Sequence, residues 1–432
     1  MKLMNARGVR DFAPEDKIIR NDLVDKLKTV FERYGFSPLE TPLIERLEVL
    51  TAKAGGNDEA DVAKEMFTFK DQGERDLGLR FELTLSFSRF IGMNPSMKMP
   101  FKRYELGPVF RDGPIKLGRY RQFWQCDVDV VGARSGVVDA ELIALSLDVF
   151  EALGLDAYLN VNNRKILKGI IEFAGIDISM ADSVIISIDK LDKIGTDGVR
   201  RELEGKGLDD GQVAKALSVF NTIGSTEEKL ATLKSILTSD IGKEGLAEME
   251  ETLSYLSDKQ KEKVNFNISL ARGLGYYTGT IFEGYMKKSK VTSSICGGGR
   301  YDEMISKLLD SKKEYPCVGI SFGLDVISDV LKENESESKK TVTKVFIIPI
   351  KTPKECFEIT KQLRDAGINA DMDLSGRGIS KNLDFANVMR IPYVVFAGQN
   401  ELQEGKVKLK NMLSGDEELL SVSDLIKKMK SF

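Results

Sequence analysis

The feature that most limits the possible folds is a pair of strand-like runs in the first third of the chain. The runs, RYELGPVFR and RQFWQCDVDVVG, span residues 103–111 and 121–132, and the loop that joins them is rich in Gly and basic residues and contains a Pro. Runs rich in Val, Phe, Tyr and Trp on either side of a Gly-containing loop predict an antiparallel hairpin. We therefore expect this part of the chain to contribute the floor of an antiparallel sheet.

Alternation along the second run places polar and aromatic side chains on one face of the predicted hairpin. They are a cation, a ring, an amide and two carboxylates: Arg121, Phe123, Gln125, Asp127 and Asp129. Arg111 and Arg119 crowd the connecting loop, and Arg is the side chain best suited to bidentate phosphate contact. This face suits a phosphorylated ligand that carries a base. A solvated hairpin with ion pairs between neighbouring side chains explains the same residues equally well.

Composition excludes several kinds of chemistry. The 432 residues contain no histidine, which rules out Ser-His-Asp and Cys-His triads, His-ligated metals and histidine general bases. The four cysteines form no CxxC pair, because even the nearest two, Cys296 and Cys317, are 21 positions apart. Any chemistry must therefore use Arg, Lys, carboxylates, Tyr, backbone dipoles and the substrate's own groups.

Charge and hydropathy limit the partners and the compartment. The formal net charge is −4, so basic groups that bind nucleic acid must be local and not spread over the chain. No run of about 18 apolar residues is present, and the charged N-terminus lacks the apolar segment of a signal peptide. We therefore expect a cytoplasmic protein with no membrane partner.

The length predicts two or three domains. Residues 1–163 and 259–332 hold the predicted hairpin and most other strand-like runs outside the tail, and form the expected main domain. Residues 164–258 are rich in Lys, Glu and Leu without strong strand runs, which predicts a helical insertion. Residues 333–343 are polar and poor in apolar residues, as a linker would be. Residues 344–432 alternate between strand and helix patterns, which predicts an α/β domain with a parallel or mixed sheet. The closing segment LLSVSDLIKKMK (419–430) is predicted to form a single helix.

Two glycine-rich nucleotide motifs are absent. In RGLGYYTGTIFE at residues 272–283 the glycines lack the GxGxxG spacing, and two tyrosines occupy the loop. The sequence also contains no GxxxxGK[ST] segment. A Rossmann or P-loop nucleotide site is therefore not expected.

Six segments, in order along the chain, resemble the histidyl-tRNA synthetase family of class II aminoacyl-tRNA synthetases. They are RGVRDFAPED (7–16), ERYGFSPLETP (32–42), LRFELT (79–84), GRYRQFWQCDVD (118–129), RGLGYYTGTIFE (272–283) and CGGGRYDEMI (296–305). The tail at 344–432 is similar to the anticodon-binding domain of these enzymes. The resemblance implies an α+β catalytic core with an antiparallel sheet flanked by helices, a helical insertion, and a C-terminal α/β domain with a mixed sheet. Asp127 and Asp129 resemble the archaeal and eukaryotic branch.

The resemblance also implies an activity. L-histidine and ATP would form histidyl-adenylate and pyrophosphate, and the histidine would then pass to the 3′ end of its tRNA. Attack of a carboxylate on a phosphate brings two anions together, so the site needs cations. Arg111 and Arg272 match the family's catalytic positions, on opposite sides of the α-phosphate. The ATP, with its Mg²⁺, would contact four residues: Arg111, Arg119, Arg121 and Phe123.

Matching positions imply how histidine and tRNA bind. The α-ammonium would bind Glu82, Thr84 and Gln125, and the imidazole would bind Asp129 and Tyr277, with Tyr276 beside it. Tyr301 is expected only to pack beneath this pocket. The full set implied for histidine is Glu82, Thr84, Arg111, Gln125, Asp129, Arg272, Tyr276 and Tyr277. Lys116, in the loop of the hairpin, would approach the tRNA. The resemblance further implies a homodimer, and no protein-bound zinc or haem.

The chain departs from the family pattern at the end of motif 3. Where the family ends in Glu-Arg, this chain has Asp325 and Val326, so a cation that packs on ATP is missing. Arg300 and Arg121 are the candidates to replace it. Two readings of another class therefore stay open: a catalytically silent paralogue that regulates ATP phosphoribosyltransferase, and an RNA-binding stress sensor. The tail domain argues against the regulatory subunit, and the retained site residues argue against both.

Overall fold

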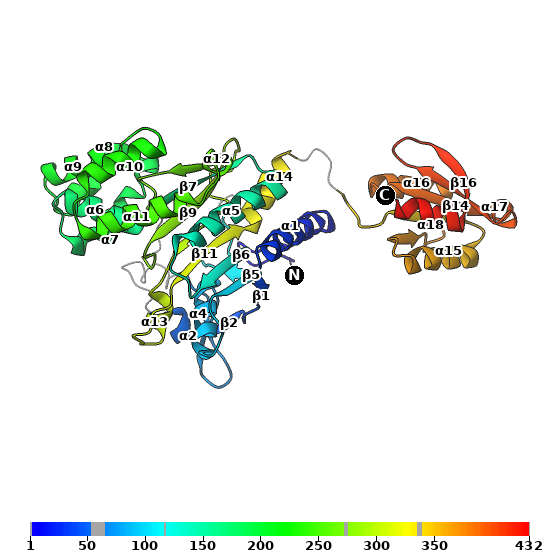
Figure 1. Cartoon of the computed structure of the whole chain (residues 1–432). Helices are drawn as coiled ribbons and strands as arrows, with labels where there is room; N and C mark the ends of the chain where they lie inside the picture. The colour runs from blue at the N-terminus through cyan, green and yellow to red at the C-terminus, as the bar shows by residue number, and fades with distance from the viewer. Residues whose placement is uncertain (1, 53–64, 116–117, 272–274, 335–338, 432) are drawn as a thin grey trace. The chain divides into compact units, whose positions relative to one another are not determined.

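The fold is given by a computed structural model, which describes residues 2–52, 65–115, 118–271, 275–334 and 339–431 (Figure 1). The chain divides into two compact units. The larger comprises Met1–Arg10 and Leu23–Asn334, and the smaller comprises Asp11–Asp22 and Glu335–Phe432.

An extended sheet forms the centre of the larger unit. Among the described residues, eight strands pair in the order β1-β5-β6-β11-β10-β9-β7-β8. Their bounds are β1 (Ser37–Pro38), β5 (Phe101–Phe110), β6 (Gln122–Val131), β11 (Cys317–Gly323), β10 (Cys296–Arg300), β9 (Thr280–Met286), β7 (Ala157–Asn163) and β8 (Val264–Phe266). The inner strands pair antiparallel, and the edge strands β1 and β8 pair parallel with their neighbours. The expected antiparallel sheet is confirmed.

The predicted hairpin is confirmed as strands β5 and β6. Their register runs from Phe101 opposite Val131 to Phe110 opposite Gln122. Since side chains alternate between the faces of a strand, the apolar residues Cys126, Val128 and Val130 enter the core on one side. The polar residues between them lie on the opposite face of the sheet.

Helices α5 (Gly136–Ala152) and α14 (Leu324–Asn334), and the second half of α1 (Pro14–Arg33), run beside the sheet (Figure 1). The Ser135 side chain caps α5 by accepting a hydrogen bond from the backbone of Val137. The ring of Phe31 lies 5.8 Å from the rings of both Tyr104 and Phe322. These contacts fix the second half of α1 over β5 and β11.

A small sheet and short helices adjoin the hairpin. They are β2 (Ile44–Arg46), β3 (Thr68–Lys70), β4 (Asp76–Leu79), α2 (Leu47–Leu50), α4 (Thr84–Met93) and α13 (Met304–Leu308). Directly after β4, the buried Arg80 donates to Glu105 Oε1 and to the Thr41 carbonyl, both at 2.8 Å. A Cβ at position 107 would lie 2.2 Å from Arg80 Nη2, so Gly107 leaves room for the guanidinium. This buried contact fixes the chain just before Glu82.

The region predicted to be a helical insertion is helical. Its elements are α6 (Arg164–Phe173), η1 (Ile178–Met180), α7 (Ala181–Ile188), α8 (Leu191–Gly205), α9 (Asp210–Phe220), α10 (Thr226–Ile236), α11 (Asp240–Ser254) and α12 (Asp258–Lys261). A capping box formed by Asp209 and Gln212 begins α9. Helices α6 and α11 pack closely at Gly169, where a Cβ would lie 2.6 Å from the Cα of Gly242. Glycine at this crossing therefore sets the helix spacing.

The tail forms a mixed sheet, as predicted. The order is β13-β12-β14-β15-β16, with β12 parallel to both β13 and β14, and with β15 and β16 antiparallel. Its elements are β12 (Val345–Ile350), α15 (Pro353–Asp365), β13 (Ala370–Met372), α16 (Ile379–Val388), β14 (Tyr393–Gly398), α17 (Gln399–Gln403), β15 (Lys406–Asn411), β16 (Glu417–Ser421) and α18 (Val422–Lys430).

One local prediction for the tail is wrong. The segment LLSVSDLIKKMK reads as a single helix in the sequence, but its first residues, Leu419 and Leu420, belong to β16. The helix begins only at Val422, where the Ser421 side chain accepts a hydrogen bond from the backbone of Asp424. Pairing of β16 with β15 therefore overrides the helical pattern.

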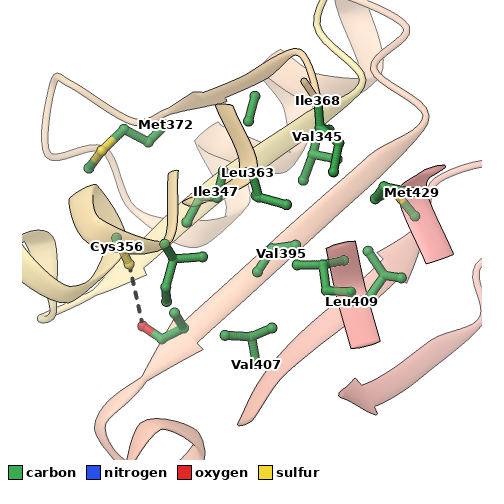
Figure 2. Close-up of a cluster of buried hydrophobic side chains, with 14 residues drawn as sticks. Val345, Ile347, Cys356, Leu363, Ile368, Met372, Val395, Val407, Leu409 and Met429 are labelled. Atoms are coloured by element: carbon green, nitrogen blue, oxygen red, sulfur yellow. Dashed lines mark hydrogen bonds between the residues drawn. The ribbon is translucent and has the colours of Figure 1, made fainter. Parts of the chain in front are cut away.

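The main core of the tail packs α15 and α18 against the sheet (Figure 2). Leu363 of α15 is fully buried there among Val345, Val395 and Leu409. Replacing Leu363 with Ala is expected to lower the free energy of unfolding of this unit by about 2–5 kcal/mol, because it leaves a cavity. Chemical denaturation of the whole protein, followed by circular dichroism, measures this loss. The exposed Phe357 on the same helix offers a matched Phe357→Ala control, for which little change is expected.

Candidate active site

The polar face of β6 opens into a cavity of about 960 Å³. The cavity gathers every residue predicted to bind histidine that the structure describes. These are Glu82, Thr84, Arg111, Gln125, Asp129, Tyr276 and Tyr277. Residues nearly 200 positions apart in the chain are therefore brought to one place by the pairing of β6, β11, β10 and β9.

A buried carboxylate and an arginine form one end of this cavity. Glu82 is 4 % exposed, and burial raises its pKa to about 7, against the opposing effect of the Arg111 guanidinium. The Tyr276 hydroxyl donates to Glu82 Oε2 at 3.4 Å, and Arg111 Nε donates to the Phe81 carbonyl at 3.1 Å. This end of the cavity can therefore bind a cationic group of a ligand at Glu82 and an anionic group at Arg111.

A second carboxylate, Asp129, is held from two sides. Arg103 Nη2 lies 2.8 Å from Asp129 Oδ2, and the Tyr301 hydroxyl donates to Asp129 Oδ1 at 2.5 Å. Burial raises the pKa of Asp129, and Arg103 opposes the shift. A Cβ at position 319 on the neighbouring strand would lie 1.9 Å from Asp129 Oδ1, so only glycine leaves room for the carboxylate. The carboxylate is thus fixed before any ligand arrives.

Free acceptors lie between these two ends. Gln125 donates through Nε2 to Ser321 Oγ at 3.2 Å, but its Oε1 accepts no hydrogen bond from the described residues. The same holds for Oδ1 of Asp127, whose pKa burial raises to about 8. A buried acceptor without a partner is costly unless a ligand donates to it. These atoms therefore favour a ligand rich in N–H groups.

Tyr276 and Tyr277 lie in the segment that precedes β9, here called the tyrosine segment, and both line the cavity. The rings of Tyr276 and Tyr277 lie 4.7 Å apart, and the ring of Tyr276 meets that of Tyr301 edge-on at 6.2 Å. Tyr301 was expected only to pack beneath the pocket. The structure instead shows it among the cavity-lining residues and bonded to Asp129.

A smaller cavity of about 390 Å³ adjoins the first. Phe123, Val326, Gly323 and Ser294 line it, and it shares Arg111, Arg119, Gln125 and Ser321 with the larger cavity. The Arg111 guanidinium lies 5.3 Å from the centre of the Phe123 ring. The geometry therefore offers an aromatic surface for a planar base, connected through Arg111 to the acidic cavity.

Comparison with known proteins identifies the family. The model of the histidyl-tRNA synthetase family matches residues 8–327, and that of an anticodon-binding domain matches residues 344–432. The chain belongs to the histidyl-tRNA synthetase family. A curated member, histidine–tRNA ligase 1 of Bacillus cereus, is 41 % identical over 428 residues, which span 98 % of this chain and 99 % of that protein.

Solved structures agree with this family assignment. A histidyl-tRNA synthetase from a Nostoc species superposes with a TM-score of 0.88 at 31 % identity, covering 100 % of this chain and 99 % of that one. A Bacillus halodurans protein described as an ATP phosphoribosyltransferase regulatory subunit/histidyl-tRNA synthetase superposes with a TM-score of 0.75 at 21 % identity, over 92 % of this chain and 98 % of that one. At that identity the second likeness extends to the fold alone.

Next to Val326, which stands at the position of the missing family arginine, Asp325 has a structural role. Asp325 accepts a hydrogen bond from the Trp124 backbone at 2.8 Å and pairs with Arg10 at 2.6 Å. Val326 lines the smaller cavity. The Arg10 guanidinium also lies over the ring of Tyr120 at 3.5 Å, beside this cavity. Sequence reasoning gave Arg10 no role.

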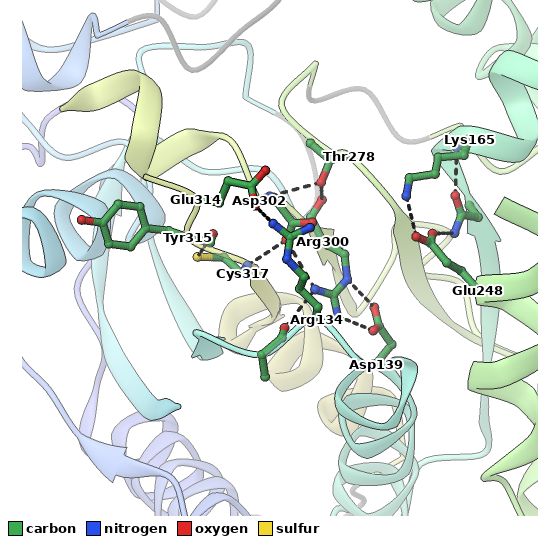
Figure 3. Close-up of polar contacts among 12 residues, drawn as sticks. Arg134, Asp139, Lys165, Glu248, Thr278, Arg300, Asp302, Glu314, Tyr315 and Cys317 are labelled. Atoms are coloured by element: carbon green, nitrogen blue, oxygen red, sulfur yellow. Dashed lines mark hydrogen bonds and ion pairs between the residues drawn. The ribbon is translucent and has the colours of Figure 1, made fainter. Parts of the chain in front are cut away.

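The two residues expected to replace that arginine have other partners. Arg300 is buried and pairs with Asp139 at 2.5 Å and with Asp302 at 3.4 Å (Figure 3). It lines neither cavity, so it is a wrong candidate for the missing cation. Arg121 pairs with Asp112 at 2.8 Å and is also not among the lining residues of either cavity.

Two predicted site residues, Arg272 and Lys116, lie outside the described residues. Within the described part of the chain, no cluster of three acidic or cysteine side chains is arranged to hold a metal ion. All four cysteines are buried thiols. No described helix is long and apolar enough to cross a membrane.

Sequence reasoning placed Asp127 on the correct face of the hairpin but gave it no role. It also missed Arg103 and Ser321, and it did not predict that Tyr301 contacts Asp129. Alternation along β6 was a sufficient signal for Asp127, which lies between Gln125 and Asp129 on that face. No local pattern marks Arg103 and Ser321, because their role comes from pairing across the sheet.

Proposed function

We propose that histidine binds in the larger cavity, that ATP binds across Arg111 into the smaller one, and that the two react where the cavities meet. Family membership makes the chain an aminoacyl-tRNA ligase for histidine. The observation that carries the assignment of sites is that one cavity brings together Glu82, Arg111, Asp129 and the open acceptors of Gln125 and Asp127. This set of groups matches an amino acid with a cationic amine, an imidazole and an anionic carboxylate.

In the proposed reaction, a carboxylate oxygen of histidine forms a bond to the α-phosphorus of ATP. The bond from that phosphorus to the β-phosphate bridge breaks, and pyrophosphate leaves. No protein base is needed, because the nucleophile is already an anion. Arg111 supplies positive charge where negative charge grows, and Arg272 is proposed to do so from the other side.

Histidine recognition follows from the cavity's acceptors. Glu82, Thr84 and Gln125 are proposed to bind the α-ammonium, and Asp129 and Tyr277 the two imidazole nitrogens. A site whose buried groups need a hydrogen-bonding side chain rejects isosteres without one by about 10⁴–10⁵-fold. The fixed position of Asp129 supports such discrimination.

ATP is proposed to stack its adenine on Phe123 and to contact Arg119 and Arg121 through its phosphates, arriving as the magnesium complex. Arg119 supports this role, since it lines both cavities and its Glu65 partner is 3.3 Å away. Arg121 would have to leave its ion pair with Asp112 to reach a phosphate. The two arginines are thus proposed to act in different ways.

Transfer RNA is proposed to contact the tail and, through Lys116, the loop of the hairpin. In the tail, Lys408 and Lys410 of β15 pair with Glu417, so these two basic side chains are partly neutralised. We also propose domain limits for the chain. The catalytic core would comprise residues 1–163 and 259–332, with a helical insertion at 164–258, a linker at 333–343 and the anticodon-binding domain at 344–432.

A homodimer is proposed from the family resemblance. Leu43 and Ile44, which follow Pro42, are 42 % and 49 % exposed, as apolar residues at an interface of separate copies would be. The archaeal or eukaryotic branch is proposed on Asp127 and Asp129 alone. The relatives compared above come from bacteria, so they give this branch no support.

ATP–pyrophosphate exchange tests the proposed function. Purified protein should exchange labelled pyrophosphate into ATP only when histidine is present, and an Arg272→Ala variant should not. A folded protein without histidine-dependent exchange would instead favour the silent paralogue.

Histidine binding is expected to release a proton from Glu82. Its pKa of about 7 leaves the free carboxyl about half protonated at neutral pH, and an α-ammonium stabilises the charged form. Binding should therefore release about half a proton at pH 7, and affinity should fall as pH falls below 7. Calorimetry in buffers of different ionisation enthalpy measures the release. A Glu82→Gln variant should lose it, while retaining contributions from Asp127 and from the ligand's imidazole.

A further inference from the structure

The segment that carries Tyr276 and Tyr277 is held by residues from the end of β7 and the start of α6. Asn162 Nδ2 donates to the carbonyls of Ile268 and Leu270, each at 2.9 Å. The next contacts along the segment come from Arg164, whose Nη1 donates to the Ala271 carbonyl at 3.3 Å. The Arg164 backbone N–H donates to the Gly279 carbonyl at 2.9 Å. Arg164 thus contacts the segment on both sides of the tyrosines.

An arginine at position 164 is energetically unfavourable unless its contacts with the segment and with a carboxylate compensate for its position and burial. It is the first residue of α6, where the helix dipole disfavours a cation, and it is 4 % exposed. A buried cation also needs a partner. Asp182, in the first turn of α7, supplies it, with its Oδ1 2.9 Å from Arg164 Nη2. The guanidinium therefore connects three parts of the chain: the tyrosine segment, β7 with α6, and helix α7.

The far side of the segment is also held from the sheet, by contacts that do not need the Arg164 side chain. The Thr278 backbone donates to the Arg300 carbonyl at 2.7 Å, and the Asp302 backbone donates to Thr278 Oγ1 at 3.1 Å (Figure 3). Arg300 and Asp302 belong to the sheet region and its following turn. Loss of the Arg164 side chain would therefore loosen the segment at Ala271, while the residues after Tyr277 keep their anchor.

We propose that Arg164 is a positioning residue for histidine activation, and that its ion pair with Asp182 makes the helical insertion part of the support of the histidine pocket. The inference rests on the proposed function of the larger cavity. It gives the insertion a role in forming the amino-acid site. Because the segment contributes to the histidine end, the affinity for histidine should respond more than the affinity for ATP.

Steady-state exchange kinetics test this role. Arg164→Ala should raise the KM for histidine about tenfold or more and change the KM for ATP less than about twofold. Arg164→Lys should fall between, since one ammonium cannot reach both the Ala271 carbonyl and Asp182. Asp182→Asn should raise the histidine KM by a few fold, and the double variant Arg164→Ala with Asp182→Asn should be no worse than Arg164→Ala alone.

A matched control lies in the same insertion. Lys190 pairs with Glu202 at 2.9 Å, and both side chains are partly exposed. Among the described residues, this pair makes no hydrogen bond to the segment that carries Tyr276 and Tyr277. Glu202→Gln should therefore leave both KM values unchanged. Equal rises of the two KM values in Arg164→Ala, wild-type kinetics in that variant, or additive effects with Asp182→Asn would each overturn the proposal.

Hydrogen exchange separates this proposal from the proposed function. The backbone amides of residues 275–277 should exchange faster in Arg164→Ala than in the wild type, and not in Glu202→Gln. That readout needs no enzymatic activity. An inactive wild type would refute the proposed function, whereas unchanged amide exchange in a folded Arg164→Ala protein would refute the positioning role.

Discussion

Replacing Arg111 with Ala is expected to lower histidine-dependent ATP–pyrophosphate exchange by about 10³-fold or more. Arg111 lines both cavities, at the place where the histidine carboxylate and the α-phosphate are proposed to meet. Two anions would approach each other there, and a fixed guanidinium can contact both of them. Without it, the growing charge on the phosphate would lose a cation that stabilises it.

The same substitution should also impair the amino-acid end of the cavity. Arg111 lowers the pKa of Glu82, which burial has raised to about 7. Without that cation the Glu82 carboxyl would be more fully protonated at neutral pH and would bind the α-ammonium poorly. We therefore expect the KM for histidine to rise together with the loss of turnover.

A matched control tests whether the loss of exchange is specific to Arg111 or follows from removing any arginine charge. Arg134 is 62 % exposed, pairs with Glu314, and lines neither cavity, so Arg134→Ala should keep wild-type exchange. Arg111→Lys should recover only part of the activity, because an ammonium cannot make two parallel contacts. An Arg111→Ala protein that stays within tenfold of the wild-type rate would refute the proposed role. Thermal melts of all variants check the folding.

The hairpin shows how much of the candidate site can be predicted from local sequence patterns. Alternation along β6 predicted the face that carries Gln125, Asp127 and Asp129, because every second side chain of a strand points the same way. The chain-order motifs then predicted that Glu82 and Tyr277 share this site, and the cavity contains both. Patterns of period two, and segments with strong family resemblance, therefore sufficed for most of the candidate site.

Such patterns did not predict which charged side chains are buried. Arg80 and Arg103 look like surface residues in the sequence, yet both are buried, and each pairs with a carboxylate on or beside the central hairpin. Their burial depends on strands that pair far apart in the chain. The same reason explains why Arg300 was misjudged: only the fold brings it to Asp139, 161 positions away.

Asp129→Asn is the second substitution with a large expected effect. It removes the anion that pairs with Arg103, a side chain with no exposed surface, and so leaves a buried guanidinium with weaker compensation. Breaking a buried pair from one side costs about 3–5 kcal/mol. We expect the lower end, about 3 kcal/mol, because Glu105 stays 3.7 Å from Arg103 and an amide can still accept one hydrogen bond. Chemical denaturation measures this loss.

The loss of histidine recognition should exceed what the loss of stability explains. Asparagine presents an N–H₂ group as well as an oxygen, so the position can no longer act as an acceptor only, and the KM for histidine should rise about 10²-fold. Tyr301→Phe is the matched comparison, because it removes the hydroxyl that donates to Asp129 Oδ1 but keeps the carboxylate and the ring. It should raise the KM by no more than about tenfold. If Tyr301→Phe and Asp129→Asn were equally impaired, the carboxylate would act only as part of a buried network, and imidazole recognition would have to come from elsewhere in the cavity.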